Sequence, residues 1–558
     1  MSPADRLLVL AGVTLPGGRR GAAAIGIRNG RIVSVGSRAD VVHACPVGAP
    51  VREMEGATVL PGLVDAHGHV LAHGFALARL DLRDVASYEE LVDRVAARAG
   101  RLPAGRWILG QGWDHTRWPG GALPHHDLLS RVTPEHPVHL RRIDMHAALV
   151  NARAMASVSL TRASTAPEGG RIVRDADGEP TGLLIDEAAG LVESSIPPPS
   201  ASARRDALER ALIHVARLGI TAVHDAGVGY APDLGVMDQA DPGWATVDQY
   251  RQMQAEHRLP VRVCVMLGGN FAHPPLASYF ARPPLAPDAE GRLRVQAVKI
   301  GVDGALGSRG AALEEPYEDD PLQAGLLTRS AEETTRIARR ALETGWQIAI
   351  HAIGDRANRV ALDALDAARR TVPSARDPRP RIEHAQVLRA SDVRRFGEGG
   401  VIASVQPVHA VSDHRWVGER LGRRVQGAYA YASLAAHGAC LAAGSDFPVE
   451  DPDPLMGLQA AVARRDGNGR PEIGWRMEEA LDLTAALAAF TRGAAHAAFM
   501  ESETGRLRPG MRADLTLVDR DPFTVSPEEI GRLQVQLTVV EGETVFDATA
   551  APAGEGRS

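Results

Sequence analysis

Short apolar runs recur along the middle of the chain, and most of them are followed by a segment with helical periodicity. We count eight such runs: Leu63–Ala66, Ile220–Val223, Val261–Leu267, Val295–Ile300, Gln347–Ile350, Arg381–Ile382, Val401–Val405 and Ala439–Ala443. Continuous apolar strands that alternate with helices indicate a parallel sheet that is covered on both faces. Eight units predict an α/β fold built on a (β/α)8 TIM barrel, although short apolar runs also occur in buried helices.

The segments between these runs have the pattern of amphipathic helices. In Ala331–Thr344, for example, Ile337, Ala338, Ala341 and Leu342 are apolar and charged residues stand between them. Apolar residues three and four positions apart form one stripe on a helix. We therefore expect such segments to cover the outside of the barrel.

Both ends of the chain have a different pattern, with alternating apolar and polar residues and Gly-rich turns. Near the start, Ala24–Ile27 and Arg31–Val35 flank the turn Asn29-Gly30. Near the end, Ala513–Val518 and Leu537–Phe546 have the same pattern. This alternation is typical of half-buried strands and hairpins. It predicts one β-sandwich from both termini, with residues 1–60 and 496–550 around a barrel at 61–495 and a tail at 551–558.

The distance from the first apolar run to the second is too long for a single crossover. Residues from about 75 to 215 contain Trp107, Trp113 and Trp118, three of the seven tryptophans, together with several Pro and Gly turns. We interpret this stretch as an insertion domain between barrel strands one and two. Such a domain could close over the mouth of the barrel.

Composition excludes several classes of protein. The chain has 558 residues, a hydrophobic content of 44%, a net charge of -7 and a pI near 6.3, which gives no bias toward polyanions. We therefore expect no nucleic-acid partner. No run approaches the roughly 18 apolar residues of a membrane span, so we expect no membrane partner either.

The cysteines point to a reducing compartment. Cys45, Cys264 and Cys440 are scattered, odd in number and without CxxC spacing. Neither a disulfide framework nor a thiolate zinc site is indicated. We expect a cytoplasmic protein, which could pair into a homodimer through the exposed faces of the sandwich.

One position stands out in the composition: Lys299 is the only lysine among 62 basic residues of the Lys and Arg types. Arginine stays protonated in proteins, whereas a buried lysine can lose its proton. A neutral amine can take up carbon dioxide and become a carbamate, which offers one oxygen to each of two metal ions. A GC-rich coding bias that spared one lysine by accident is the alternative, and the neighbours of Lys299 decide between the two.

Those neighbours are polar residues at the ends of the apolar runs. His67 and His69 follow the first run, and residues two apart on a strand point the same way. Alone, such a pair could equally be two surface histidines in a turn. Further candidates end the later strands, namely His351, His384 and Asp446, and Lys299 lies on the fourth. Because barrel active sites gather at the C-terminal strand ends, these residues are expected to converge as nitrogen and oxygen ligands.

The chain resembles the amidohydrolase superfamily, in particular the YtcJ-like branch that includes N-substituted formamide deformylases. The resemblance spans nearly the whole chain. Its motifs are residues 60–69 (LPGLVDAHGH), 298–304 (VKIGVDG), 351–355 (HAIGD), 381–384 (RIEH), 444–446 (GSD) and 505–515 (GRLRPGMRADL).

The resemblance implies a site with two divalent metal ions, with zinc as the default and manganese, iron, cobalt and nickel as alternatives. It implies that His67, His69 and Asp446 bind one ion and that His351 and His384 bind the other. N6-carboxylated Lys299 would bridge the two ions.

Family motifs in the insertion add candidates for substrate contact. They are Trp113, Asp114, Arg141, His146 and Asn151, and Arg309 and Asp303 after the lysine strand could line the mouth. Trp113 could equally anchor the core of the insertion, and Arg141 could equally form a surface ion pair.

The resulting prediction is a hydrolase that cleaves a carboxamide C–N bond of a small N-substituted formamide or N-acyl amine. A metal-bound hydroxide attacks the carbonyl carbon, and Asp446 shuttles the proton to the leaving nitrogen. A cyclic amide or ester substrate, or a tailoring step in specialised metabolism, fits equally well. A metal-dependent lyase or decarboxylase is disfavoured by Asp446, and a non-catalytic barrel is disfavoured because all six ligands are present.

Overall fold

The computed structural model describes residues 7–13, 15, 23–45, 49–142, 147–167, 169–229, 242–268, 276–285, 291–373 and 377–550. Two compact parts divide the chain. The first, here called the barrel part, consists of Met1–His73 and Leu208–Ser558, and the second, the insertion part, is Gly74–Ala207. Among the described residues, no helix is both long and apolar enough to cross a membrane.

Eight parallel strands form the centre of the barrel part, in the order β19-β18-β17-β16-β15-β14-β13-β6. Their bounds are β6 Leu63–Gly68, β13 Ile220–Gly229, β14 Arg262–Gly268, β15 Leu293–Gly301, β16 Gln347–Ala352, β17 Arg381–His384, β18 Ile402–Val405 and β19 Leu441–Ala443. Each strand coincides with one of the eight apolar runs, so the predicted (β/α)8 barrel is confirmed.

Backbone hydrogen bonds of candidate site residues connect the first strand of the barrel to the segment after the last strand. The backbone N–H of Asp446 donates to the carbonyl of His67 at 2.7 Å, and that of His69 donates to Phe447 at 2.7 Å. Gly68 and Phe447 form a parallel bridge. The closure of the sheet therefore also fixes the backbone of His67, His69 and Asp446.

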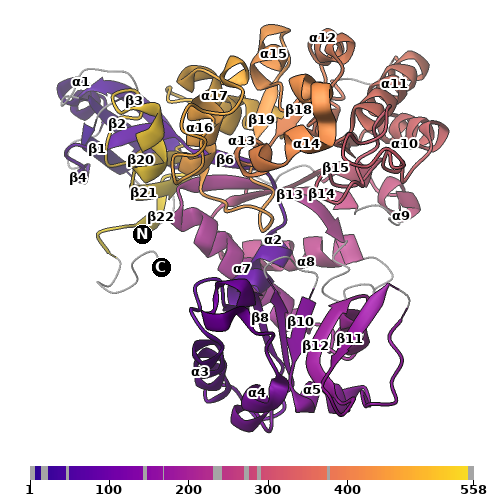
Figure 1. Ribbon diagram of the computed structural model, residues 1–558. Helices are drawn as coiled ribbons and strands as arrows, with labels where there is room; N and C mark the ends of the chain where they lie inside the picture. The colour runs from indigo at the N-terminus through magenta and orange to yellow at the C-terminus, as the bar shows by residue number, and fades with distance from the viewer. Residues whose placement is uncertain are drawn as a thin grey trace. The chain divides into compact units, whose positions relative to one another are not determined.

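Amphipathic helices cover the outside of the sheet, as α10, α11, α12 and α15 show in Figure 1. Helix α10 spans Ala331–Glu343 and confirms the helix predicted there. Ser330 caps it by accepting from Glu333, and its buried face carries Ile337, Ala338, Ala341 and Leu342. The other helices of the barrel part are α1 Arg38–Ala44, α8 Pro242–Ala255, α9 Leu276–Phe280, α11 Asp355–Thr371, α12 Ala390–Glu398, α13 Pro407–Ser412, α14 Val417–Leu421, α15 Tyr431–Ala436, α16 Pro454–Ala463, α17 Leu483–Ala488 and α18 Ala494–Ala497.

The two chain ends build two four-stranded sheets, with orders β3-β2-β1-β4 and β22-β21-β20-β5. Their strands are β1 Leu7–Val13, β2 Ala23–Arg28, β3 Arg31–Ser37, β4 Val51–Glu53, β5 Thr58–Pro61, β20 Leu515–Val518, β21 Val535–Val540 and β22 Glu543–Asp547. Ile25, Ile27 and Val59 share one apolar core with Leu515 and Leu537. The predicted composite β-sandwich is therefore confirmed.

The insertion part lies between strands β6 and β13 and has a six-stranded sheet of order β11-β12-β10-β9-β8-β7. Its elements are β7 Leu80–Asp81, α3 Tyr88–Ala99, β8 Ile108–Trp113, α4 His126–Val132, β9 Val138–Arg142, β10 Ala147–Val150, α5 Ala152–Ser157, β11 Gly170–Arg174, β12 Pro180–Asp186 and α6 Ala189–Glu193. Helices α2 (Val70–Ala78) and α7 (Ala201–Arg217) lead into it and out of it. Trp113 and Trp118 stack in its core at 5.8 Å.

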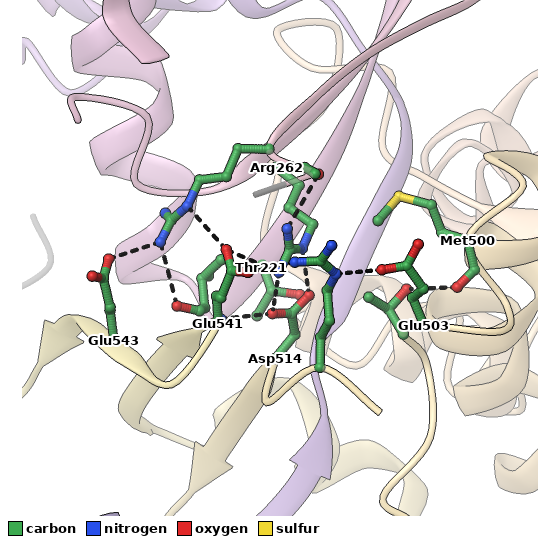
Figure 2. Close-up of polar contacts among 12 residues, drawn as sticks. Thr221, Arg262, Met500, Glu503, Asp514, Glu541 and Glu543 are labelled. Carbon is green, nitrogen blue, oxygen red and sulfur yellow. Dashed lines mark hydrogen bonds and ion pairs between the residues drawn. The ribbon is translucent and has the colours of Figure 1, made fainter. Parts of the chain in front are cut away.

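Buried charges join the sandwich to the N-terminal end of the barrel (Figure 2). Arg262, the first residue of β14, donates from Nε and Nη2 to both carboxylate oxygens of Asp514, at 2.7 and 2.9 Å. Asp514 directly precedes β20 and also accepts from the backbone N–H of Glu541 at 2.8 Å. Arg512 pairs with Glu503 and Glu541 beside them. A bidentate pair between groups 1% and 3% exposed connects the two cores.

In the Arg262–Asp514 pair, each group stabilises the charged form of the other. Burial alone raises the pKa of the Asp514 carboxyl, but the charge and hydrogen bonds of Arg262 outweigh it, so the pKa lies below its ordinary value. Both groups are therefore charged at neutral pH. Removal of one of them would leave the other buried and unpaired.

We expect Arg262→Met to lower the free energy of unfolding by about 3–5 kcal/mol, because Asp514 would stay buried without its cation. Denaturant unfolding followed by circular dichroism measures this loss. The matched control is Arg339→Met, which removes an exposed ion pair with Glu343 on α10 and should cost about 1 kcal/mol or less. Equal effects of the two substitutions would contradict a structural role for the buried pair.

Candidate active site

The six predicted ligand residues come together at the C-terminal ends of the barrel strands. They are His67 on β6, His69 after it, Lys299 on β15, His351 on β16, His384 at the end of β17 and Asp446 after β19. All are buried except His69, whose side chain is 32% exposed. Residues separated by more than 300 positions in the sequence thus form one polar cluster.

Short distances connect the cluster. Asp446 Oδ1 lies 3.0 Å from His69 Nε2 and 3.5 Å from His67 Nε2. Lys299 Nζ lies 2.9 Å from His67 Nε2. The ring of His384 lies 4.9 Å from that of His67 and 4.5 Å from that of His351, measured between centroids. His67 is therefore the central member.

The backbone takes up a rare conformation at two of these residues. His384 has a φ of 75° and Asp446 a φ of 64°, in the left-handed region that non-glycine residues seldom occupy. In both places the strand ends and the chain turns away while the side chain stays in the cluster. Such strain persists only where the surrounding structure enforces it, and it is frequent at functional sites.

The imidazoles of His67, His351 and His384 are neutral at neutral pH. Burial, and secondarily the charge of Lys299, lowers the pKa of His67 to about 4 and that of His351 to about 3. Burial followed by the neighbouring His351 holds the pKa of His384 well below its ordinary value. A neutral imidazole has a free lone pair, which is the form that binds a metal.

The other two members also have shifted pKa values. Burial raises the pKa of Asp446, but the hydrogen bond with His69 and the electrostatic influence of the neighbouring histidines outweigh it, and the pKa lies well below the usual range. The carboxyl is thus ionised. Burial lowers the pKa of Lys299, although Glu383 and Asp446 favour its charged form. This shift moves Lys299 toward the neutral amine, the form that reacts with carbon dioxide.

Arg381 and Glu383 set the orientation of His67. The Nδ1 of His67 lies 2.5 Å from Glu383 Oε2. Because an ionised carboxylate only accepts, Nδ1 carries the proton and donates it, which leaves the Nε2 lone pair facing Lys299 and Asp446. Arg381 Nε lies 2.7 Å from the second oxygen of Glu383. Burial raises the pKa of Glu383, but Arg381 and His67 outweigh it and keep the carboxyl ionised.

Asp65 connects strand β6 to the segment after β19 by hydrogen bonds. Its Oδ1 accepts from the backbone N–H of His67 at 2.9 Å, and its Oδ2 accepts from the hydroxyl of Ser445 at 2.6 Å. Ser445 immediately precedes Asp446. Burial raises the pKa of Asp65 to about 7. One side chain therefore holds the backbone on both sides of the cluster.

Asp303 and Asp225 likewise accept backbone N–H groups next to other predicted ligands. Asp303 accepts from the backbone N–H groups of Ile353 and Gly354 at 3.0 and 2.8 Å, in the turn that follows His351. Asp225, within β13, accepts from the backbone N–H of Val70 at 3.0 Å, directly after His69. The hydroxyl of Tyr250 donates to its other oxygen at 2.7 Å. Each aspartate thus fixes a turn that carries a histidine.

A metal ion fits this donor set. The ligand atoms of His67, His384 and Asp446 all lie within 4.8 Å of one another, so they can converge on one ion. The Nδ1 of His384 is buried and, within the part of the chain that the structure describes, has no hydrogen-bond partner. An orphaned buried nitrogen is costly unless a ligand satisfies it. These residues form a possible metal-binding group, and ligation by His69, Lys299 and His351 stays a prediction.

The predicted substrate contacts have structural partners. Trp113 is fully buried in the insertion part, and its indole N–H donates to the carbonyl of Leu140 at 2.8 Å. Asp114 pairs with Arg142 at 2.8 Å and caps the short turn His115–Arg117. Both therefore stabilise the insertion part. Their role in substrate contact stays a prediction.

Among the remaining candidates, Arg141 pairs with Glu193 at 2.7 Å, and Arg309 pairs with Asp319 at 2.8 Å. Asn151 is buried and bonds to the backbone around Val138 and Thr133. His146 lies outside the described residues. Contact of these side chains with a substrate likewise stays a prediction.

Sequence reasoning missed a residue that lies beside the cluster, His409 on helix α13. Its Nε2 lies 3.9 Å from Asp446 Oδ2, and its ring is parallel to that of His384 at 6.1 Å. A signal was present, because His409 follows the seventh apolar run as the other site residues follow theirs. Asp225 follows the second apolar run in the same way, whereas Arg381 and Asp65 lie within apolar runs and had no comparable signal.

Comparisons with known proteins agree with this geometry. The sequence pattern of the amidohydrolase family matches residues 51–546. The chain belongs to the amidohydrolase family. YtcJ of Bacillus subtilis (strain 168) is 34% identical over 505 residues, which cover 90% of this chain and 92% of YtcJ. The predicted likeness to the YtcJ branch is thereby confirmed.

Two further comparisons also cover nearly the whole chain. The N-substituted formamide deformylase of Arthrobacter pascens is 29% identical over 558 residues, covering 98% of this chain and 99% of that enzyme. A solved structure of an uncharacterized metal-dependent hydrolase from Pyrococcus furiosus has a TM-score of 0.74 and 28% identity, covering 93% of this chain and all of that one (100%). Together with the family match, they support assignment of this amidohydrolase as a hydrolase.

We expect Glu383→Gln to weaken metal binding about 10- to 100-fold, because a neutral amide no longer holds the Nδ1 proton of His67 as firmly. Titration of the metal-free protein with Zn²⁺ measures this affinity. Glu501→Gln serves as the matched control, since Glu501 forms a partly exposed pair with Arg379. An unchanged affinity in Glu383→Gln, with a native circular dichroism spectrum, would contradict the orienting role of Glu383.

Proposed function

We propose that this amidohydrolase hydrolyses a carboxamide C–N bond of a small N-substituted formamide or N-acyl amine. The observation that carries the proposal is the convergence of neutral His67 and His384 with ionised Asp446 around the single lysine. The likeness to an N-substituted formamide deformylase over nearly the full length of both chains supports the substrate class. The three cysteines are unpaired, which fits the proposed cytoplasmic setting.

We further propose that six residues hold two divalent ions, with zinc as the default. His67, His69 and Asp446 would bind one ion, His351 and His384 the other, and carboxylated Lys299 would bridge them. Divalent ions in such a site polarise a carbonyl and lower the pKa of water from about 15.7 toward about 7. The buried, neutral histidines and the shifted Lys299 amine are suited to bind these ions.

Asp446 is the residue that we propose moves the proton. Its Oδ1 faces His67 and His69, whereas its Oδ2 points toward His409 on the other side. As an ionised carboxylate it can accept a proton from the attacking water and then donate it to the leaving nitrogen. The C–N electron pair goes to that nitrogen, so the products are a carboxylic acid and an amine.

The direct test is a metal analysis of the purified protein combined with a panel of formanilides, N-acyl amino acids, lactams and esters. We expect two divalent ions per chain and turnover of at least one amide, with loss of turnover in a chelator and recovery with Zn²⁺. Turnover of an ester or lactam alone would contradict the proposed N-substituted formamide or N-acyl amine substrate and favour a cyclic amide or ester instead. A metal-loaded protein that cleaves no member of the panel would contradict the proposal.

We expect Asp446→Asn to keep the fold and bound metal but to lower kcat by about 10²- to 10⁴-fold, because an amide cannot carry the proton. Steady-state kinetics on the best amide, together with metal content, measure both properties. Asp451→Asn, which changes an aspartate five positions away, is the control for a general loss of charge. Near-normal turnover by Asp446→Asn would exclude the proton shuttle.

A further inference from the structure

His409 contributes a polar atom to the site from the end of β18, one of the three barrel strands that the predicted ligand set leaves unused. Strand β18 ends at Val405, and helix α13 starts with Pro407 directly afterwards. The first turn of this helix carries His409 toward the cluster, where its side chain is 12% exposed. The seventh strand thus supplies a side chain in the same way as the first, fifth and sixth strands.

The ring of His409 has no partner for one of its nitrogens. Its Nε2 is buried and makes no hydrogen bond to any residue that the structure describes. Burial of an unsatisfied ring nitrogen costs about 1–3 kcal/mol. Its parallel arrangement with His384, at 5° between the ring planes, does not satisfy Nε2. A bound molecule that hydrogen-bonds to Nε2 would recover this cost.

The position of that molecule is bounded by Asp446. Nε2 lies 3.9 Å from Asp446 Oδ2, which is too long for a direct hydrogen bond. Two polar atoms at this separation can both lie at about 2.8–3.0 Å from one third atom. Asp446 Oδ1 is turned toward His67 and His69, so Oδ2 is the oxygen that can exchange a proton with this third atom.

The leaving nitrogen of a secondary amide has the matching chemistry. In the tetrahedral intermediate it carries one N–H, which can be donated, and one lone pair, which can be protonated. An ester oxygen or a tertiary amide nitrogen has no hydrogen to donate. The two groups on the protein therefore suit a nitrogen that gives its hydrogen to one and takes a proton from the other.

We infer that His409 is a further catalytic residue, whose Nε2 accepts the N–H of the scissile amide and directs the nitrogen lone pair at Asp446. Asp446 then donates the proton it received from water, the C–N bond breaks, and its electron pair stays on the nitrogen. The amine leaves and the acyl group becomes a carboxylic acid. This inference rests on the proposed function and deepens it, because it selects amides that bear an N–H.

The test compares formanilide with N-methylformanilide, which lacks the N–H, in the metal-loaded protein. We expect the unaltered protein to prefer formanilide in kcat/KM by about 10- to 100-fold. His409→Ala should lower kcat/KM for formanilide by a similar factor and abolish most of the preference, with metal content unchanged. His409→Gln, whose carbonyl oxygen can accept the same N–H, should keep part of it.

His437→Ala, at an exposed position after α15, is the matched control and should leave the preference intact. A preference that persists in His409→Ala would overturn the inference, as would loss of metal in that variant or an equal loss on both substrates. Failure of the metal-loaded, unaltered protein to cleave any amide would instead remove the proposed function on which the inference rests.

Discussion

A fully buried ion pair inside the barrel, Arg381–Glu383, determines how the His67 ring of the candidate site is oriented. Arg381 and Glu383 are two residues apart on β17, so both side chains point inward. Arg381 also donates to the carbonyl of Ala66 and to the hydroxyl of Ser404, which ties β17 to β6 and β18. Glu383 fixes the Nδ1 proton of His67, and the free nitrogen of that ring then faces the cluster. The barrel could not rearrange this pair without leaving a buried charge unpaired.

The two ends of the barrel use buried polar side chains for different purposes. At the N-terminal end, Arg262 and Asp514 hold the sandwich against strand β14, and this contact contributes stability. At the C-terminal end, Asp65 and Asp303 accept backbone N–H groups next to the predicted ligands, so their burial serves to position other groups. This division agrees with the general pattern of TIM barrels, in which chemistry lies at the C-terminal face.

The barrel and most of the cluster could be predicted from the sequence because their signals are local. Each strand is an apolar run, and a polar residue at its end must lie at the same face as the others. The Arg262–Asp514 pair could not be predicted in this way, since 252 positions separate its members and arginines are common throughout the chain. Trp113 illustrates a second limit, because an aromatic residue in a family motif can serve packing, substrate contact or both. His409 was missed although its signal was local, because the six expected ligands already formed a complete set.

We propose that Lys299, the only lysine, is carboxylated and bridges two metal ions. The decisive measurement is carbon-13 NMR of the zinc-loaded protein prepared with ¹³C-bicarbonate, compared with Lys299→Arg, together with metal analysis of both proteins. We expect a carbamate carbon signal and two ions per chain in the unaltered protein, and neither in the folded Lys299→Arg variant. Two ions without a carbamate signal, or a Lys299→Arg protein that retains both ions, would contradict this proposal.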